Sequence, residues 1–301
     1  MWIVLLMYAL FASTFTAGKH ILLITSPFFF TGVRMLAAGA VLLLIQLLRD
    51  PSSLKIRKEF LPYICLLGAF NVFITNAFEY WGMQELESAK ACLIYSLSPL
   101  FSIVLSYYFF GERMNGLKWL GIGVGFLGFI PIFLLSPTEE SLLKVPTIYE
   151  SAVMISALTS VIGWMTMKKL VKNTTISFVT ANLYSFLLAG VLALVWAFFT
   201  EPLAPLPVYP LSTFLPEMFF ILLAHNVICY NLYSYSLSRF SVSFMTFAGF
   251  VTPLFAEFFG WFFLGESCSW LFFASLGVII FGLVLYAQGE KRATHEALTT
   301  A

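Results

Sequence analysis

Residues 98–112 read SPLFSIVLSYYFFGE, and residues 252–266 read TPLFAEFFGWFFLGE. The second stretch repeats the pattern of the first at an offset of 154 residues, counted from Pro99 to Pro253. The matched pairs are Pro99 and Pro253, Gly111 and Gly265, and Glu112 and Glu266. The same offset also aligns the sequence FLP at 60–62 with FLP at 214–216. Several matches in one register predict that the chain consists of two related halves.

The composition predicts a membrane protein. Of 301 residues, 60% are hydrophobic and 10% are charged, and the mean hydropathy is +0.92. A soluble domain of this length needs a larger charged surface, so the surplus apolar surface must face lipid. The net charge of +1 and the lack of a basic run argue against a nucleic-acid partner. The four cysteines are scattered, so we expect no metal and no cofactor.

Apolar segments long enough to span a bilayer follow one another along the whole chain. The sequence therefore predicts an all-α membrane protein with ten transmembrane helices. We place them at 2–18, 27–48, 61–83, 88–110, 117–135, 148–167, 176–199, 215–236, 241–263 and 270–288.

The loop charges predict the orientation. Basic residues concentrate in alternate loops, for example at Arg49, Lys55 and Arg57, whereas the opposite loops carry only Lys19, Lys90 and Lys144. Because cytoplasmic loops are rich in Lys and Arg, both termini are expected in the cytoplasm. The expected location is the inner membrane of a bacterium, with lipid around the bundle. We expect a monomer or a weak dimer.

The repeat implies an inverted topology. Each half holds five helices, an odd number, so the second copy must enter the membrane the other way up. Such inverted repeats are how many secondary transporters surround a site at the membrane midplane. We assign 1–136 to the first repeat, 137–147 to a linker, 148–289 to the second repeat and 290–301 to a cytoplasmic tail.

One face of the fourth helix carries small or polar residues at steps of four and three. They are Ser88, Cys92, Tyr95, Pro99, Ser102 and Ser106. This face either packs closely against another helix or lines a cavity, with Pro99 and Pro253 as points where a gate bends. The two interpretations are compatible.

These features together resemble the drug/metabolite transporter superfamily, in particular its ten-helix members with two EamA-type repeats. The resemblance is carried by Ser98-Pro99-Leu100 running to Gly111-Glu112, and by Thr252-Pro253-Leu254 running to Gly265-Glu266. It covers nearly the whole chain. It implies a bundle whose central cavity opens alternately to either side, and substrates such as amino acids, nucleotide sugars or drugs. The length and the aromatic-rich helices are also similar to those members that import S-adenosylmethionine into intracellular bacteria.

Ionisable residues within spans are costly, so each is a candidate for function. Glu79 shares a helix with Asn76, and Glu257 lies in the ninth helix. The repeat counterpart of Glu257 is Ile103, an asymmetry that favours a role with substrate or protons. The alternative for both glutamates is a protonated carboxyl bonded to a neighbouring helix.

Arg34 is the lone cation deep in the second helix. It either binds a substrate carboxylate or pairs within the scaffold, and the resemblance favours the scaffold or a gate.

The eighth helix gathers polar and aromatic residues within two turns. His225, Asn226 and Tyr230 indicate a polar cavity wall, although a lone histidine is commonly just a buried, satisfied group. Tyr95 and Trp164 are candidate ring faces for a sulfonium or ammonium substrate. Glu112 and Glu266, each beside a glycine, are interpreted as loop anchors.

The sequence therefore predicts a secondary transporter for a small polar or zwitterionic metabolite, such as an amino acid or an S-adenosylmethionine-like compound. A proton or an exchanged metabolite is the expected energy source. A lipid or amphiphile flippase remains an alternative, and an intramembrane enzyme is a weaker one, because no catalytic motif occurs.

Overall fold

The computed structural model describes residues 2–86, 91, 94–95, 97–112, 114–135, 146–173, 176–202, 210–264 and 270–299. The described part is helical and holds no strand. The first half contains α1 (Trp2–Ile21), α2 (Pro27–Arg49), α3 (Leu61–Leu66), the π-helical segment η3 (Leu67–Ile74), α4 (Thr75–Glu85), α6 (Ser98–Phe110) and α7 (Gly116–Leu135). The second contains α8 (Ile148–Asn173), α9 (Phe178–Thr200), α10 (Leu211–Ile221), the π-helical segment η4 (Leu222–Cys229), α11 (Tyr230–Ser236), α12 (Val242–Ala248), α13 (Val251–Leu264) and α14 (Trp270–Thr299).

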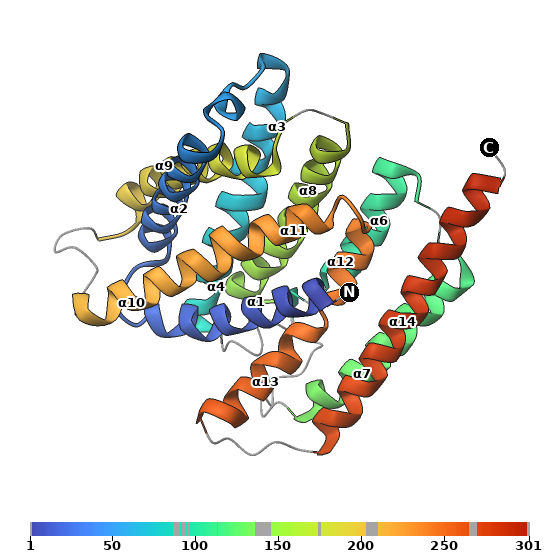
Figure 1. Cartoon of the computed structure of the whole chain (residues 1–301). Coiled ribbons are helices and arrows are strands. Elements are labelled where there is room, and N and C mark those ends of the chain that lie inside the picture. Colours follow the sequence, from blue (N-terminus) through green and yellow to red (C-terminus); the bar gives the residue numbers. More distant parts are fainter. Residues whose placement is uncertain are drawn as a thin grey trace.

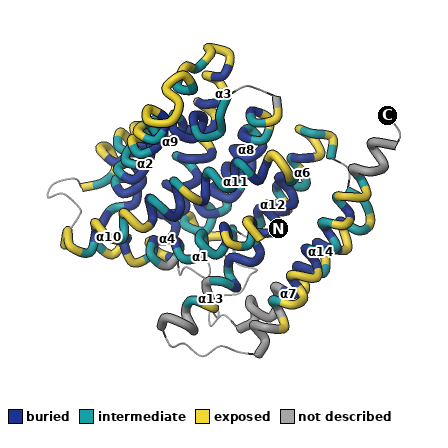
Figure 2. The backbone as a smooth tube through the Cα atoms, viewed as in Figure 1, coloured by how far each residue is buried: buried dark blue, intermediate teal, exposed yellow. Residues whose placement is uncertain are grey.

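Among the described residues, six helical stretches are long and apolar enough to cross a bilayer, so the chain is a multi-pass membrane protein. They are Trp2–Ile21, Pro27–Arg49, Lys58–Glu85, Ile148–Lys172, Phe178–Thr200 and Leu211–Ser236. Shorter apolar helices lie at Ser98–Phe110, Gly116–Gly128 and Val242–Phe255. Large apolar side chains such as Tyr108 and Phe199 are exposed on the outside of the bundle, whereas Figure 2 shows buried residues toward its centre.

The helices pair in a regular pattern. In Figure 1, α2 runs beside α9, and α7 runs beside α14. The helix α6 packs against α12, while α1 contacts α13 and α8 contacts α6. Finally, α1 contacts η4, and α8 contacts η3. Each of these contacts thus either joins corresponding elements of the two halves or has a counterpart between the corresponding elements.

Two helix ends are satisfied by charged side chains from distant parts of the chain. The Glu201 carboxylate accepts hydrogen bonds of 2.8 Å from the backbone N–H groups of Phe28 and Phe29, at the start of α2. The Lys19 ammonium donates to the carbonyl oxygens of Met83 and Leu86, at the end of α4. Both charges complement the helix dipoles and satisfy backbone groups that would otherwise lack partners.

The structure departs from the sequence prediction in two spans. In the predicted helix 88–110, Leu97 lies in a turn and α6 begins only at Ser98. The predicted helix 241–263 is divided into α12 and α13 by a turn at Gly249 and Phe250. Pro253 explains the break, because a proline ring clashes with the carbonyl four residues earlier, which is that of Gly249.

Two other helices extend beyond their predicted ends. The helix α8 continues past 167 to Asn173, and α14 continues past 288 to Thr299. Residues 290–299 contain no glycine or proline that would end a helix, so the predicted tail is helical through Thr299.

The contact between α7 and α14 depends on glycine. A Cβ atom added at Gly121 would lie 2.7 Å from the carbonyl oxygen of Gly282 and 2.7 Å from the amide nitrogen of Tyr286. Backbone atoms cannot move aside as a flexible side chain can, so these helices pack closely only because both positions lack a side chain.

We expect Gly121→Ala to lower the stability of the protein by about 1–3 kcal/mol through this overpacking. Gly123→Ala is the matched control, since a Cβ there meets nothing within 4 Å and gains the same helix propensity. Thermal unfolding of both variants in detergent measures the difference. Equal melting temperatures would show that the α7–α14 contact does not require glycine.

Candidate functional site

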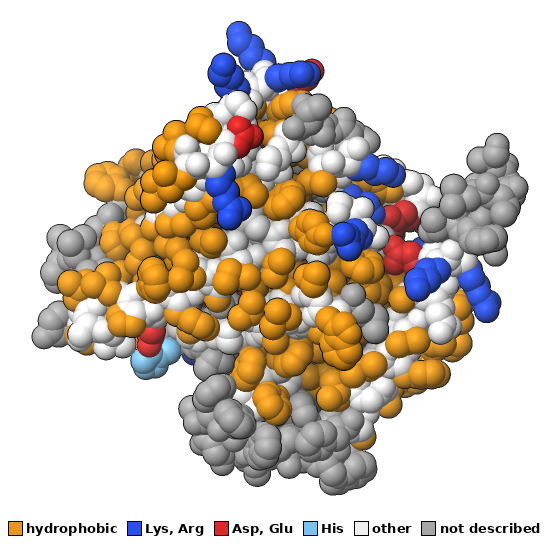
Figure 3. Space-filling view, viewed as in Figure 1, with side chains coloured by type: hydrophobic (Ala, Val, Ile, Leu, Met, Phe, Trp, Pro, Cys, Tyr) orange, Lys and Arg blue, Asp and Glu red, His pale blue; other side chains and the backbone are white. Residues whose placement is uncertain are grey.

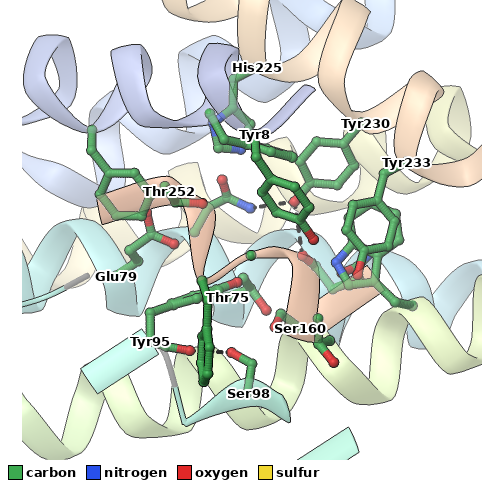
Figure 4. Close-up of a pocket in the computed structure, with 18 of the residues that line it drawn as sticks. Tyr8, Thr75, Glu79, Tyr95, Ser98, Ser160, His225, Tyr230, Tyr233 and Thr252 are labelled. Carbon is green, nitrogen blue, oxygen red and sulfur yellow. Dashed lines mark hydrogen bonds between the residues drawn. The ribbon is translucent and has the colours of Figure 1, made fainter. Parts of the chain in front are cut away.

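A cavity lies where α1, α4, η4, α11 and the break between α12 and α13 converge. The space free of protein atoms among its lining residues, including the part that is open to solvent, measures about 820 Å³. Both π-helical segments contribute to its wall, through Asn71 of η3 and His225 of η4. Figure 4 shows how side chains from separate helices meet around it.

Aromatic rings form one side of the cavity. Trp164 of α8 stacks on Tyr233 of α11, with ring centroids 3.9 Å apart and an angle of 18° between the planes. The ring centroids of Tyr230 and Trp164 lie 5.1 Å apart. Those of Tyr8 of α1 and Tyr233 lie 6.5 Å apart, in an edge-to-face arrangement. Such a cluster offers ring faces to a flat heteroaromatic group or to a cation.

Glu79 is the acidic side chain of the cavity. Among the described lining residues it is the one with a carboxylate, and none is a lysine or arginine. Its exposed fraction is 7%, and Figure 4 shows it in the same cavity as Tyr95 and Thr252. A buried carboxylate beside aromatic faces favours a positively charged ligand group.

Arg34 does not line the cavity. Its guanidinium donates hydrogen bonds of 2.7 Å to Asn76 Oδ1 and 3.3 Å to the Tyr80 hydroxyl. The carbon of the guanidinium also lies 5.2 Å from the ring centroid of Phe30 and 4.9 Å from that of Tyr80. The structure thus places Arg34 in the scaffold behind the cavity.

Asn76 connects this scaffold to the cavity wall. Its side-chain nitrogen donates to the Tyr230 hydroxyl at 2.9 Å and to the Val72 carbonyl at 2.8 Å. The Tyr230 hydroxyl in turn donates to the carbonyl oxygen of Asn71 at 3.1 Å. A chain of hydrogen bonds therefore fixes the Tyr230 ring relative to α2 and α4.

Of the site residues proposed from the sequence, most meet in this cavity. Those that line it are Glu79, Asn76, Tyr95, Trp164, His225, Tyr230 and Pro253. Asn226 is fully buried elsewhere and donates to the sulfur of Met35 at 3.0 Å. The side chain of Glu257 lies outside the described part of the structure, as do Gly265 and Glu266.

Sequence reasoning missed the contribution of the first helix. Tyr8, Phe11 and Phe15 of α1 line the cavity. Their spacing of three and four residues marks one helix face, but an aromatic face in a membrane helix is by default attributed to lipid contact.

Side-chain hydrogen bonds join α6 to α12. Ser102 Oγ lies 2.7 Å from Thr246 Oγ1, and Ser243 donates to Ser106 at 3.1 Å. Beyond the end of α6, Gly111 adopts a left-handed conformation with φ of 62°, and the carboxylate of Glu112 lies 3.5 Å from the Lys168 ammonium. Glu112 thus ties the loop after α6 to α8.

Comparison with known proteins agrees with this architecture. The sequence profile described as the EamA-like transporter family matches residues 1–134 and again residues 147–288. The chain belongs to the EamA-like transporter family. A solved crystal structure that is 16% identical aligns with a TM-score of 0.77 over 97% of this chain and 96% of that chain, a likeness that concerns the fold alone.

Several relatives of this EamA-like chain carry transporter names. The S-adenosylmethionine/S-adenosylhomocysteine transporter of Chlamydia muridarum is 32% identical over 289 residues, which cover 94% of this chain and 90% of that protein. The protein of the same name from Chlamydia trachomatis serovar L2 is also 32% identical, over 87% of its length. The uncharacterized inner membrane transporter YedA of Escherichia coli K12 is 28% identical and covers 88% of this chain. The family transports small molecules, so this chain is a transporter and not an enzyme.

The scaffold role of Arg34 has a direct test. Arg34→Gln removes the forked donor and the charge, and it leaves Asn76 and Tyr80 without their partner. We expect a loss of about 2 kcal/mol or more in stability, because buried polar groups are left unsatisfied. Arg57→Gln is the control, since Arg57 is exposed. If thermal unfolding of Arg34→Gln matched the wild type while ligand binding was lost, Arg34 would belong to the binding site instead.

Proposed function

We propose that this protein exchanges S-adenosylmethionine for S-adenosylhomocysteine, or closely similar sulfonium and thioether metabolites, across a bacterial inner membrane. Transport proceeds by alternating access of one central cavity, which two inverted repeats of five helices surround. Both termini lie in the cytoplasm. The observation that carries the substrate proposal is the position of Glu79 in the same cavity as a cluster of aromatic rings.

The helix pairing supports the inverted repeats. Corresponding helices of the two halves lie side by side, as α2 with α9 and α7 with α14. The π-helical segments η3 and η4 occupy nearly matching positions in the two halves, and matched prolines lie at the start of α6 and at the break before α13. This is the arrangement expected when two copies are related by an axis in the membrane plane.

The charge distribution supports the orientation. On the face that Figure 3 shows, the Lys and Arg side chains lie toward the upper and right-hand end of the bundle, with an apolar surface beside them. This end includes the exposed residues Lys55, Arg57 and Lys58 in the loop between α2 and α3. Because positive loops stay inside, this end is the cytoplasmic end. The name of the Escherichia coli relative, an inner membrane transporter, agrees with this location.

The cavity chemistry supports the substrate class. S-adenosylmethionine carries a sulfonium cation, an ammonium group and a flat purine ring. A carboxylate suits the cations, and stacked aromatic residues suit both the cations and the purine. The names of the two Chlamydia relatives point to the same compounds.

Counterflow into proteoliposomes tests the proposal. Vesicles with purified protein, loaded with unlabelled S-adenosylhomocysteine, are expected to accumulate external radiolabelled S-adenosylmethionine, while vesicles without protein do not. Glu79→Gln should weaken uptake on the order of tenfold, because the buried counter-charge for the sulfonium is lost. Glu85→Gln in the same helix is the matched control, since Glu85 is exposed. Absence of uptake by the wild type would refute the proposed function.

The hydrogen bonds between α6 and α12 are expected to hold the cytoplasmic side closed. The double variant Ser102→Ala with Thr246→Val removes one of these contacts, which is worth about 1 kcal/mol. A shift of that size raises the population of the inward-open state several-fold. Labelling of a cysteine introduced at Ser106 from the cytoplasmic side measures this change. An unchanged labelling rate would show that the contact does not control opening.

A further inference from the structure

Thr14 of α1 meets His225 of η4 at the cavity wall. Thr14 Oγ1 lies 3.2 Å from Nδ1 of His225, and both side chains are buried. A threonine hydroxyl has a single hydrogen. In Thr14 this hydrogen is donated to the carbonyl oxygen of Phe11 at 2.8 Å. A carbonyl oxygen can only accept, so we assign the hydroxyl as acceptor toward the imidazole and the ring hydrogen to Nδ1.

The state of Nδ1 determines whether the second ring nitrogen of His225, Nε2, can accept a hydrogen bond. An uncharged imidazole with its hydrogen on Nδ1 has a lone pair on Nε2, and a charged ring is costly at this depth in the membrane. The ring is held by Phe11, which meets it edge-on at 5.1 Å, and by Tyr230 at 5.5 Å. His225 lines the cavity, so Nε2 is available as a hydrogen-bond acceptor on a fixed ring.

The hydroxyl hydrogens of several other lining residues are committed to backbone carbonyls. Tyr8 donates to Met245, Tyr230 to Asn71, Ser98 to Tyr95, Ser160 to Ala157 and Thr75 to Phe70. Both hydrogens of the Asn76 amide are likewise used, by Val72 and Tyr230. These side chains therefore have no hydroxyl or amide hydrogen left for a ligand, whereas Nε2 of His225 and the carboxylate of Glu79 are acceptors in the same wall.

We propose that Thr14 fixes the tautomer of His225, and that His225 Nε2 accepts a hydrogen bond from an exocyclic amine on a flat heteroaromatic ring. This inference rests on the proposed function, in which that amine is the 6-amino group of adenine. Thr14 is a positioning residue, whereas His225 contacts the substrate. In a base with a carbonyl oxygen in place of the amine, that oxygen and His225 Nε2 would both be acceptors. No hydrogen bond could form between them, so such a base would bind poorly.

Competition against radiolabelled S-adenosylmethionine in proteoliposomes tests this inference. The two competitors are S-adenosylhomocysteine and S-inosylhomocysteine, which differ by the amine and the carbonyl at position 6 of the purine. We expect the wild type to prefer the adenosyl compound on the order of tenfold, because one unsatisfied buried acceptor opposes the inosyl compound. In Thr14→Val the ring can adopt either tautomer. The ratio of the affinities for the adenosyl and inosyl compounds should therefore fall toward 1:1, while uptake persists.

Two control variants accompany Thr14→Val. Thr14→Ser keeps the hydroxyl and should keep the preference. Ser13→Ala should also keep it, because the Ser13 hydroxyl makes the equivalent bond to the carbonyl of Leu10 without lining the cavity. If Thr14→Val does not yield folded protein, Thr14→Ala removes the same hydroxyl with less bulk.

The outcomes separate this inference from the proposed function. Uptake of S-adenosylmethionine without discrimination between the competitors, or full discrimination in Thr14→Val and Thr14→Ala, would overturn the role of His225 and leave the transporter proposal standing. Absence of uptake in the wild type would overturn both. A fall in preference confined to the variants without a hydroxyl at position 14 supports the inference.

Discussion

Inside a lipid bilayer no water is available to satisfy polar groups, so a polar side chain within a span needs a partner in the protein, either in its own helix or in another one. Arg34 shows the consequence. Its guanidinium donates hydrogen bonds to Asn76 and Tyr80 and lies over the ring of Phe30. Asn76 in turn donates a hydrogen bond to the Tyr230 hydroxyl. One network therefore joins α2, α4 and α11. It also fixes the orientation of a cavity-lining ring, so the requirement that stabilises the bundle shapes the site.

Close packing and local breaks have opposite roles around this network. Glycines allow α7 and α14 to approach until backbone meets backbone, as at Gly121 and Gly282. Proline and π-helical turns interrupt the regular hydrogen bonding where the cavity lies, for example at Pro253 and along η4. The closely packed pair α7 and α14 lies at one edge of the bundle, whereas the π-helical segments η3 and η4 each contribute a residue to the cavity wall. An alternating-access transporter needs this division between rigid bodies and points that bend.

The sequence predicted the six apolar spans of the described residues, because membrane spans are long and apolar and their pattern can be read from the sequence. It also predicted Glu79, Trp164 and Tyr230 as cavity residues, since polar or aromatic groups at that depth have few other roles. It could not separate Arg34 from the binding site, because the distinction depends on which helix supplies Asn76. Nor could it identify Tyr8, since an aromatic residue in the first helix is as consistent with lipid as with a cavity until α11 is placed beside it.

If the two repeats cross the membrane in opposite senses around one cavity, matched positions of the repeats must lie on opposite sides of the membrane. Glu59 and Thr213 are such a pair, each one residue before the sequence FLP. Single cysteines at these positions, in a variant without the four native cysteines, can be labelled with a membrane-impermeant maleimide in intact bacterial cells. The cysteine at 213 should react in intact cells, and the cysteine at 59 only after permeabilisation. Labelling of both from the same side would contradict the inverted repeat and the transport mechanism that depends on it.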